Sequence, residues 1–381
     1  MSKLRILLVS VGQFGQRYLD ELTARTDDGE LIGVVDIAPD LSRRFPVIRE
    51  RNIPVYQSLN DFYAKDTADL AVICSPIHLH TEMVLTALRH GSHVLCEKPL
   101  CADEAETLQM SDAAEAAGRF LAVGWQLNYD PVVLRIKRDI LEGRFGKPIR
   151  GRCIHAMRRG RNYYSRNNWS GHITVNGRPV LDSPFMNGCA HNFQLMTFLL
   201  GGSLSEAQDI KGVEGELYRA NPAIENYDIA ALRFTTVENV TLLYLTAHPL
   251  AAKDLGQSAE IRFDAGVLSW GRHRQYRFDY LDGRAPVIYG PGADSISLKK
   301  VHDIIRCIRE QAQPVSLART GLPHLRAVKL AQNLPIRQID PEHIEVLEGD
   351  GDRFLCVQDL ESVLMNAYTA YALPGEIGQT L

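Results

Sequence analysis

The sequence lacks the features that mark membrane, secreted and zinc-stabilised proteins. No apolar stretch approaches the roughly 20 residues that a helix needs to span a bilayer. The segment Met1 to Ser10 leads into a glycine-containing turn and not into a small-residue cleavage site. The seven cysteines are scattered, and none forms a C-x-x-C pair, which argues against structural zinc and a disulfide framework. We therefore expect a soluble, cytoplasmic protein without a metal site.

Basic charge is also scarce. Lysine and arginine total 42 against 46 aspartates and glutamates, which leaves a formal net charge of −4. Nucleic acids and anionic membranes select basic surfaces, so neither is expected as a partner. Internal repeats are absent too, and 381 residues exceed the usual size of one hydrophobic core. Two domains are the default expectation.

The first third of the chain alternates between strand and helix patterns. Continuous apolar runs suited to buried parallel strands lie at residues 4–10, 31–35, 53–56, 70–74, 93–96 and 120–123. Helical patterns separate them through Tyr18, Leu19 and Leu22, after Ser58, and at residues 81–90 and 103–117, the last two closed by Gly91 and Gly118. Repeated strand-helix units predict a parallel, doubly wound sheet.

The turn after the first strand is the expected cofactor site. It reads Ser10-Val11-Gly12-Gln13-Phe14-Gly15, so Ser10 replaces the first glycine of G-x-G-x-x-G. Glycine lets the backbone approach a pyrophosphate, and the helix that follows presents unpaired N–H groups to the anion. Asp36 ends the second strand, where a carboxylate can accept hydrogen bonds from a ribose diol. The pattern favours NAD, while Arg43 and Arg44 keep NADP open.

Three further motifs carry a family resemblance. Val94-Leu95-Cys96-Glu97-Lys98-Pro99-Leu100 resembles the Glu-Lys-Pro signature of the Gfo/Idh/MocA oxidoreductases. The turn from Cys74 to His80 is similar to the family's small-Pro-Asn-x-x-His turn, and Val123-Gly124-Trp125 looks like its Val-Gly-Phe strand end. The cofactor residues indicated by the turn and by the resemblance are Ser10, Gly12, Gln13, Phe14, Gly15, Asp36, Ser75, Pro76, His80, Glu97 and Lys98.

The resemblance implies a Rossmann domain over residues 1–123. Residues 124–381 would form an α/β domain whose large, open, mainly antiparallel sheet binds substrate and mediates a homodimer or homotetramer. Alternating patterns at residues 149–155, 228–235, 241–246, 260–263 and 276–280 support antiparallel strands independently. Helical patterns lie at residues 133–141, 191–200, 298–311 and 325–334, and a strand and helix at residues 353–371 form a C-terminal extension.

Lys98 is the candidate general acid/base. Hydride transfer from a secondary alcohol needs a group that takes the hydroxyl proton, and a lysine with a lowered pKa can do so. Pro99 restricts the backbone beside it and suggests a cis Lys98–Pro99 bond. The family also shows Asp-x-Gly-x-His-x-x-Asp at a helix start, and here the chain reads Asn187-Gly188-Cys189-Ala190-His191-Asn192-Phe193-Gln194. His191 matches, but Asn187 cannot carry a proton away as an aspartate could.

A basic and aromatic loop from Arg158 to Trp169 contains no acidic residue. Tyrosine and tryptophan faces suit sugar C–H surfaces, asparagine suits hydroxyls, and an arginine fork suits a carboxylate or phosphate. An anionic sugar derivative therefore fits the loop; a solvated loop covering a neighbouring subunit is the alternative. The candidate substrate-binding residues are Trp125, Asn128, Arg158, Tyr163, Tyr164, Asn168 and Trp169.

We therefore predict an oxidoreductase that transfers a hydride on a hydroxyl or ketone of a sugar, cyclitol or sugar acid. Two alternatives stay open. One is a redox-neutral lyase or glycosidase that oxidises the sugar only transiently through bound NAD. The other is a non-catalytic dinucleotide sensor, suggested by Ser10, Ile77, Asn187 and Cys189. Fold alone does not decide among the three.

Overall fold

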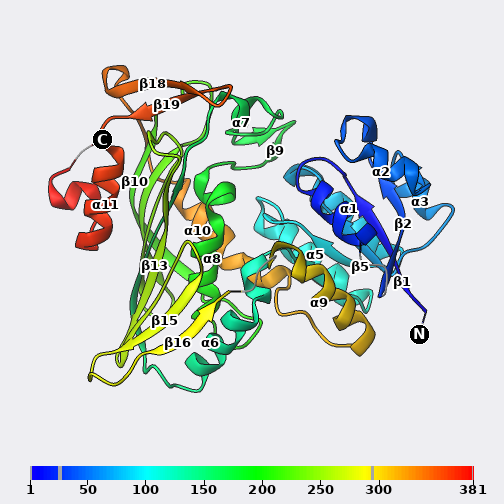
Figure 1. Cartoon of the computed structure of the whole chain (residues 1–381), viewed down its shortest axis with the longest axis horizontal. Helices are drawn as coiled ribbons and strands as arrows, with labels where there is room; N and C mark the ends of the chain where they lie inside the picture. The colour runs from blue at the N-terminus through cyan, green and yellow to red at the C-terminus, as the bar shows by residue number, and fades with distance from the viewer. Residues whose placement is uncertain (1, 25–27, 293–295, 380) are drawn as a thin grey trace. The chain divides into compact units, whose positions relative to one another are not determined.

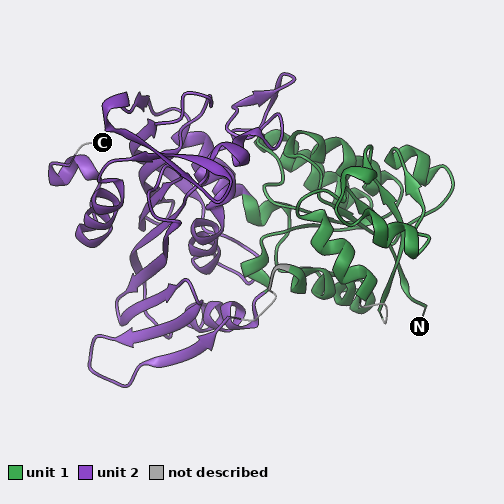
Figure 2. Ribbon diagram, turned by 45° about the horizontal axis from the view of Figure 1, so that its top comes forward, with its two compact units in different colours: residues 1–129, 294–321 green, residues 130–293, 322–381 purple. Residues whose placement is uncertain are grey.

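The computed structural model describes residues 2–24, 28–292, 296–379 and 381. The chain divides into two compact units, which Figure 2 colours separately. Unit 1 comprises residues 1–129 and 294–321, and unit 2 comprises residues 130–293 and 322–381. Among the described residues, no helix combines the length and the apolar composition needed to cross a membrane.

Unit 1 is built on a six-stranded parallel sheet in the order β3-β2-β1-β4-β5-β6 (Figure 1). The strands are β1 Leu4–Val9, β2 Gly29–Val35, β3 Val55–Tyr56, β4 Leu70–Ile73, β5 His93–Cys96 and β6 Leu121–Val123. The helices between them are α1 Gly15–Ala24, α2 Phe45–Glu50, α3 Leu59–Tyr63, α4 His80–Arg89 and α5 Glu104–Ala116. The order reverses between β1 and β4, and in such sheets ligands bind beyond the strand ends at this point.

One helix of unit 1 comes from much later in the chain. Helix α9 (Ile296–Glu310) places Val301, Ile304 and Ile305 in the same buried cluster as β1 and α1 residues such as Ile6 and Leu19. We expected this helix in the second domain with the rest of residues 124–381, whereas its apolar stripe completes the core of unit 1. The predicted division of labour between residues 1–123 and 124–381 stays a prediction.

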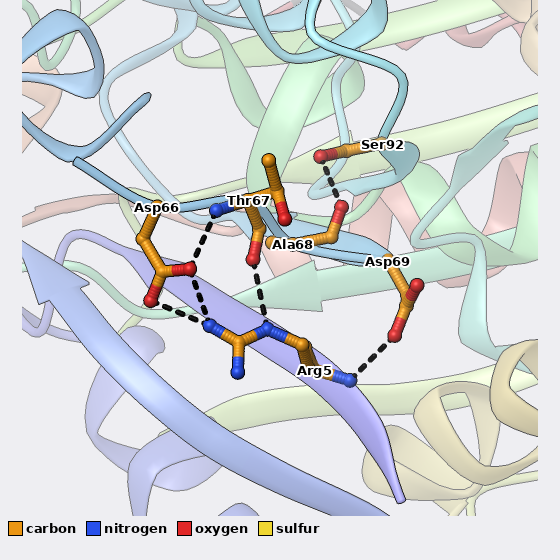
Figure 3. Close-up of polar contacts among 6 residues, drawn as sticks. All are labelled: Arg5, Asp66, Thr67, Ala68, Asp69 and Ser92. Carbon is orange, nitrogen blue, oxygen red and sulfur yellow. Dashed lines mark hydrogen bonds and ion pairs between the residues drawn. The ribbon is translucent and has the colours of Figure 1, made fainter. Parts of the chain in front are cut away.

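A polar network fixes the start of β1 against the segment before β4 (Figure 3). The Arg5 guanidinium forms an ion pair with Asp66 and donates from Nε to the Thr67 carbonyl at 3.1 Å. The Arg5 backbone N–H donates to Asp69 Oδ2 at 2.8 Å, and Ser92 Oγ donates to the Ala68 carbonyl at 2.6 Å. The Arg5 contacts tie β1 to the segment entering β4, its neighbour in the sheet, and the Ser92 contact ties that segment to the residue before β5.

Unit 2 contains a nine-stranded mixed sheet in the order β16-β15-β14-β13-β7-β12-β11-β10-β17. Its neighbours are antiparallel except for the parallel pairs β7–β12 and β10–β17. The strands are β7 Pro148–Met157, β10 Ile210–Arg219, β11 Ile229–Thr236, β12 Thr241–Ala247, β13 Asp254–Phe263, β14 Gly266–Gly271, β15 Gln275–Tyr280, β16 Val287–Pro291 and β17 Ile336–Gln338. Two small hairpins, β8 Thr174–Val175 with β9 Arg178–Pro179 and β18 Ile344–Gly349 with β19 Asp352–Val357, lie apart from it.

Helices cover both faces of this sheet where it is most buried (Figure 1). The helices of unit 2 are α6 Pro131–Leu141, α7 Arg161–Ser165, α8 Ala190–Leu199, α10 Leu322–Ala331 and α11 Leu360–Ala370. Helix α11 packs its Leu360 and Leu364 with Ile229 and Leu243 of the sheet. On the α8 side, the rings of Phe193 and Phe234 lie 4.7 Å apart. The predicted fold class, a Rossmann sheet with a large and mainly antiparallel second sheet, is confirmed.

Candidate cofactor and catalytic sites

The turn between β1 and α1 is shaped by two residues. Ser10, at the position of the first motif glycine, has a left-handed backbone with a φ of 70° and donates its N–H to the Val35 carbonyl at 2.8 Å. A Cβ on Gly15 would lie 2.1 Å from the Ser10 carbonyl oxygen, so no other residue fits there without moving the backbone. Helix α1 begins at Gly15, which points its first N–H groups toward the turn.

Asp36 lies directly beside this turn. Its Oδ2 accepts the Val11 N–H at 2.8 Å, and its Oδ1 accepts the Ala38 N–H at 2.9 Å. Each carboxylate oxygen keeps further lone pairs for a ribose hydroxyl. Of the two arginines that kept NADP open, Arg44 pairs with Asp20 at 2.9 Å, and Arg43 is exposed. The Asp36 carboxylate is therefore the charged group that hydrogen bonds hold in place beside the turn.

A cavity of about 270 Å³ opens at the same edge of the parallel sheet. Ser10, Asp36, Ser75 and Pro76 line it, together with Ile37, whose side chain is 83% exposed. The Ser75 hydroxyl oxygen is buried and has no hydrogen-bond partner among the described residues. Apolar and polar side chains both line this cavity, which lies next to a glycine turn and contains an unsatisfied hydroxyl. Such a cavity fits the adenosine half of a dinucleotide.

His80 connects this cavity to the Lys98 segment. The side chain is 1% exposed. Its Nε2 lies 2.7 Å from the Ser75 carbonyl oxygen, and its Nδ1 lies 2.9 Å from that of Leu100 and 3.1 Å from that of Pro99. Burial lowers the pKa of His80, although these carbonyls oppose the effect. The imidazole thus holds the turn after β4 and the turn after β5 in one arrangement.

Glu97 is the centre of a buried ion pair. Its Oε1 accepts from Lys300 Nζ, a side chain with no exposed surface, and from Tyr18 Oη at 2.8 Å. Burial, and then the Glu97 charge, raise the pKa of Tyr18 well above its usual value, so the phenol stays a donor. This network links α1, the end of β5 and α9. The Glu97 carboxylate is thereby occupied inside unit 1, and its contact with the cofactor stays a prediction.

Lys98 follows directly on this anchored position. Its side chain is half-buried, and its backbone N–H donates to Glu97 Oε2 at 3.2 Å. The Lys98–Pro99 peptide bond is cis, as Pro99 suggested. Hydrogen bonds therefore hold the backbone on both sides of Lys98. Glu97 accepts from the Lys98 N–H, and His80 contacts the carbonyls of Pro99 and Leu100.

The second candidate catalytic motif lies entirely in unit 2. His191 is half-buried in the first turn of α8, and Asn187 lies in the helical turn Pro184–Gly188 that precedes it. Asn187 Nδ2 donates to Asp182 Oδ1 at 2.9 Å, and the Gly171 N–H donates to Asp182 Oδ2 at 2.7 Å. The contact with Asp182 thus orients the Asn187 amide.

Part of the basic and aromatic segment packs beside this motif. A Cβ on Gly188 would lie 3.8 Å from Tyr163 Oη and 3.2 Å from His248 Nε2. Tyr164 Oη lies 2.8 Å from His248 Nδ1. Burial, and then the charges of Arg159 and Arg166, hold the pKa of His248 well below its usual value. The structure thus brings Tyr163 and Tyr164 to the loop that carries Asn187 and His191.

Two guanidinium groups lie close to the Tyr163 ring. The Arg166 Cζ is 3.8 Å from the ring centroid, and the Arg159 Cζ is 4.7 Å from it. The segment expected to be a loop contains the short helix α7. Its compact turn allows one tyrosine to contact two arginines that lie seven residues apart in the sequence.

The other predicted substrate residues are less accessible or lie elsewhere. Arg158 donates to the Ala251 carbonyl at 2.7 Å, Asn168 is exposed, and Trp169 is 8% exposed. In unit 1, Trp125 is 2% exposed and Asn128 has no exposed surface, its Nδ2 donating to Ser316 Oγ at 3.3 Å. The roles of these five residues in substrate binding stay predictions.

Sequence reasoning missed Lys300, Tyr18, Asp182 and His248. A buried lysine on an amphipathic helix carries no local signal, because its partner Glu97 lies 203 residues away. His248 follows β12 at a strand end and could have been noted there. Among the described residues, no group of three or more histidine, cysteine, aspartate or glutamate side chains is placed to hold a metal ion.

Known proteins match both the sequence and the fold. Inositol 2-dehydrogenase 4 of Saccharopolyspora erythraea is 33% identical over 156 residues, which cover 40% of this chain and 45% of that protein. Inositol 2-dehydrogenase of Burkholderia vietnamiensis is 27% identical over 54% of this chain and 57% of its own length. The chain therefore spans about half the length of the curated relatives it matches.

Among solved structures, the WlbA dehydrogenase from Chromobacterium violaceum, in complex with NADH and UDP-GlcNAcA, has a TM-score of 0.72 and 22% identity. The similarity covers 94% of this chain and 97% of that one, and it shows the fold. Residues 4–125 match the sequence model described as "Oxidoreductase family, NAD-binding Rossmann fold". The resemblance carried by Glu97-Lys98-Pro99 is thus confirmed over residues 4–125, which match the Gfo/Idh/MocA oxidoreductase model and form a Rossmann sheet of the NAD-binding type that the model describes.

Proposed function

We propose that this protein is an NAD-dependent dehydrogenase or reductase acting on a hydroxyl or ketone of a sugar, cyclitol or sugar acid. The observation that carries the proposal is the double contact of His80, 2.7 Å from the Ser75 carbonyl and 2.9 Å from that of Leu100. It connects the dinucleotide cavity to the segment that carries Lys98. The inositol dehydrogenases among the relatives support a polyhydroxylated substrate.

Lys98 is the general acid/base in this proposal. NAD, when bound, supplies the hydride acceptor, and the Lys98 amine takes the hydroxyl proton of the substrate during oxidation and returns it during reduction. His191 assists by donating to or accepting from a substrate hydroxyl. Asn187, oriented by Asp182, positions a hydroxyl but transfers no proton.

The test is a comparison of Lys98→Met with Lys65→Met. Lys65 is an exposed lysine of the same unit, 5.9 Å from the Tyr56 ring centroid. Lys98→Met should bind NADH normally and lose about 10²–10⁴-fold in kcat, the usual contribution of a positioned general acid/base. The control should keep both properties. An unchanged kcat in Lys98→Met would remove Lys98 from the mechanism.

Both alternative functions are outcomes of the same assay. A redox-neutral lyase or glycosidase would consume its sugar without net NADH formation, yet still depend on Lys98. A sensor would bind NADH and turn over no substrate. The retention of Lys98 and His191 in structured positions favours the dehydrogenase over the sensor.

A further inference from the structure

Unit 2 contains a second and larger cavity, of about 900 Å³. It lies between α7, the connection from β10 to β11, the residues after β12 and the hairpin β18–β19. This volume is near the upper end of the range for ligand pockets and exceeds what one sugar ring needs. Part of the wall is apolar, formed by residues such as Pro222, Pro249, Ile339 and Ile344.

Arginines dominate the charge of this cavity. Arg159, Arg161, Arg219 and Arg353 all line it. Arg161 and Arg353 are exposed, and Arg353 Nε lies 3.6 Å from Glu348 Oε1. Arg219 donates to two backbone carbonyls, those of Ile224 and Glu225, so its charge is not neutralised by these contacts.

The carboxylates near the cavity accept hydrogen bonds from backbone N–H groups. Asp228 is the one carboxylate in the lining, and its two oxygens accept the N–H groups of Ala220 and Asn221, each at 2.9 Å. Asp352, beside Arg353, accepts the Asn162 N–H at 2.9 Å. Four guanidinium groups against one lining carboxylate leave the cavity electropositive, although the whole chain is acidic.

Two buried nitrogen atoms at this cavity have no hydrogen-bond partner among the residues that the structure describes. They are Arg159 Nε and Nε2 of His248, a side chain that is 2% exposed. Leaving such atoms unsatisfied costs stability, so each of them needs a partner that the described residues do not supply. A phosphate oxygen would accept from an arginine in the geometry that guanidinium groups favour.

His248 also relates the cavity to the catalytic loop of the same unit. It lines the cavity, and its Nε2 would lie 3.2 Å from a Cβ at position 188. Because residue 188 is glycine, this nitrogen approaches the backbone there more closely than most side chains would allow. Asn187 and His191 lie on either side of Gly188 in the sequence, so a ligand held in the cavity would extend toward the proposed reacting groups.

We propose that this cavity binds the phosphate-bearing part of the substrate, and that the substrate is a carbohydrate linked to phosphate and to an apolar or aromatic group, as in a nucleoside diphosphate sugar. This inference rests on the proposed function and narrows its substrate class. The arginines bind the phosphates, and the proline and isoleucine wall contacts the aromatic group. A free neutral sugar would leave both features unused.

The test is calorimetric titration of the full-length protein with inorganic pyrophosphate, UDP and glucuronate. NADH is kept at saturation, so that phosphates do not enter the dinucleotide site of unit 1. The variant is Arg161→Gln with Arg353→Gln, two exposed side chains whose loss should not disturb folding. The matched control is Arg284→Gln, an exposed arginine of unit 2 that pairs with Asp282.

We expect UDP and pyrophosphate to bind, UDP more tightly because of the apolar wall, and the double variant to weaken both at least about tenfold, as the loss of charge-assisted contacts implies. Equal affinity of the variant and the control would overturn the inference, and so would binding of glucuronate alone. Arginine-dependent UDP binding without any nicotinamide absorbance change would keep the inference and reject the dehydrogenase. If the double variant turned over neutral sugars as fast as the parent protein, the dehydrogenase would be kept and the inference would be rejected.

Discussion

At the scale of single residues, the amine that we propose as the acid/base depends on neighbours that would do no chemistry. Lys98 is held between Glu97 and the His80-bound backbone of Pro99 and Leu100. Glu97 in turn is neutralised by Lys300, which has no exposed surface. A buried ion pair adds little net stability over an apolar pair, but removing one partner leaves an uncompensated charge. Lys300 is therefore a positioning residue for Lys98.

Lys300→Met should destabilise unit 1 by about 3–5 kcal/mol, because the Glu97 carboxylate then remains buried without its cation. The double variant with Glu97→Gln should recover most of this loss, since glutamine can still accept from Tyr18. Denaturant unfolding of the two variants measures the difference. A double variant no more stable than the single one would refute the role given to this pair.

At the scale of elements, the turn between β1 and α1 shows how two glycines of one motif differ. A Cβ at Gly12 would meet Ser10 Oγ at 3.8 Å, an ordinary contact. A Cβ at Gly15 would lie 2.1 Å from the Ser10 carbonyl oxygen, which is backbone and cannot rotate away. Gly12 is thus needed only for the approach of a ligand, and Gly15 also for packing the helix on the strand.

Gly15→Ala should therefore lower the stability of unit 1 by about 1–3 kcal/mol, the usual cost of overpacking. Gly12→Ala should unfold within about 0.5 kcal/mol of the parent protein. Both variants should bind NADH more weakly. Thermal unfolding without cofactor and fluorescence titration with NADH separate the two effects. If Gly12→Ala proved as unstable as Gly15→Ala, the proposed distinction between the glycines would be incorrect.

The elements that sequence could predict are those with strong local patterns. The parallel strands of unit 1 and α6, α8, α9 and α11 follow from apolar runs and helical periodicity. Strand β10 was missed because Ile210–Arg219 carries two glycines and two glutamates, which weaken a strand pattern. The packing of α9 on unit 1 could not be predicted, because an apolar stripe does not identify its partner. The Asp182–Asn187 contact likewise depends on the folded path of the segment between them.

At the scale of the whole molecule, buried charge makes stability depend on pH. Lys137 of α6 has no exposed surface, donates to the Glu206 carbonyl, and lies 3.6 Å from the Phe198 ring centroid. Burial lowers the pKa of Lys137 to about 7, against about 10.4 for a lysine in an unfolded chain. Between these values the unfolded state binds the additional proton, so stability should rise with pH across this window.

Lys137→Met removes this titration, so the difference in stability between the variant and the parent protein isolates its contribution. The stability of the variant relative to the parent should be greatest near pH 6–7 and should decline toward pH 10, by at most about 1.4 kcal/mol per pH unit. Thermal unfolding of both proteins over this range measures the difference, and groups common to both cancel. A difference independent of pH would show that the Lys137 amine stays charged in the folded protein.

The measurement that tests the central claim most directly is titration of the intact protein with NADH and NADPH, followed by absorbance at the nicotinamide band with a panel of neutral, acidic and phosphate-linked sugars and cyclitols. The account predicts tighter binding of NADH than of NADPH, because the Asp36 carboxylate would repel a 2′-phosphate, and a substrate-dependent absorbance change that Lys98→Met abolishes. Absence of dinucleotide binding, or tight binding with no absorbance change on any of these substrates, would contradict it.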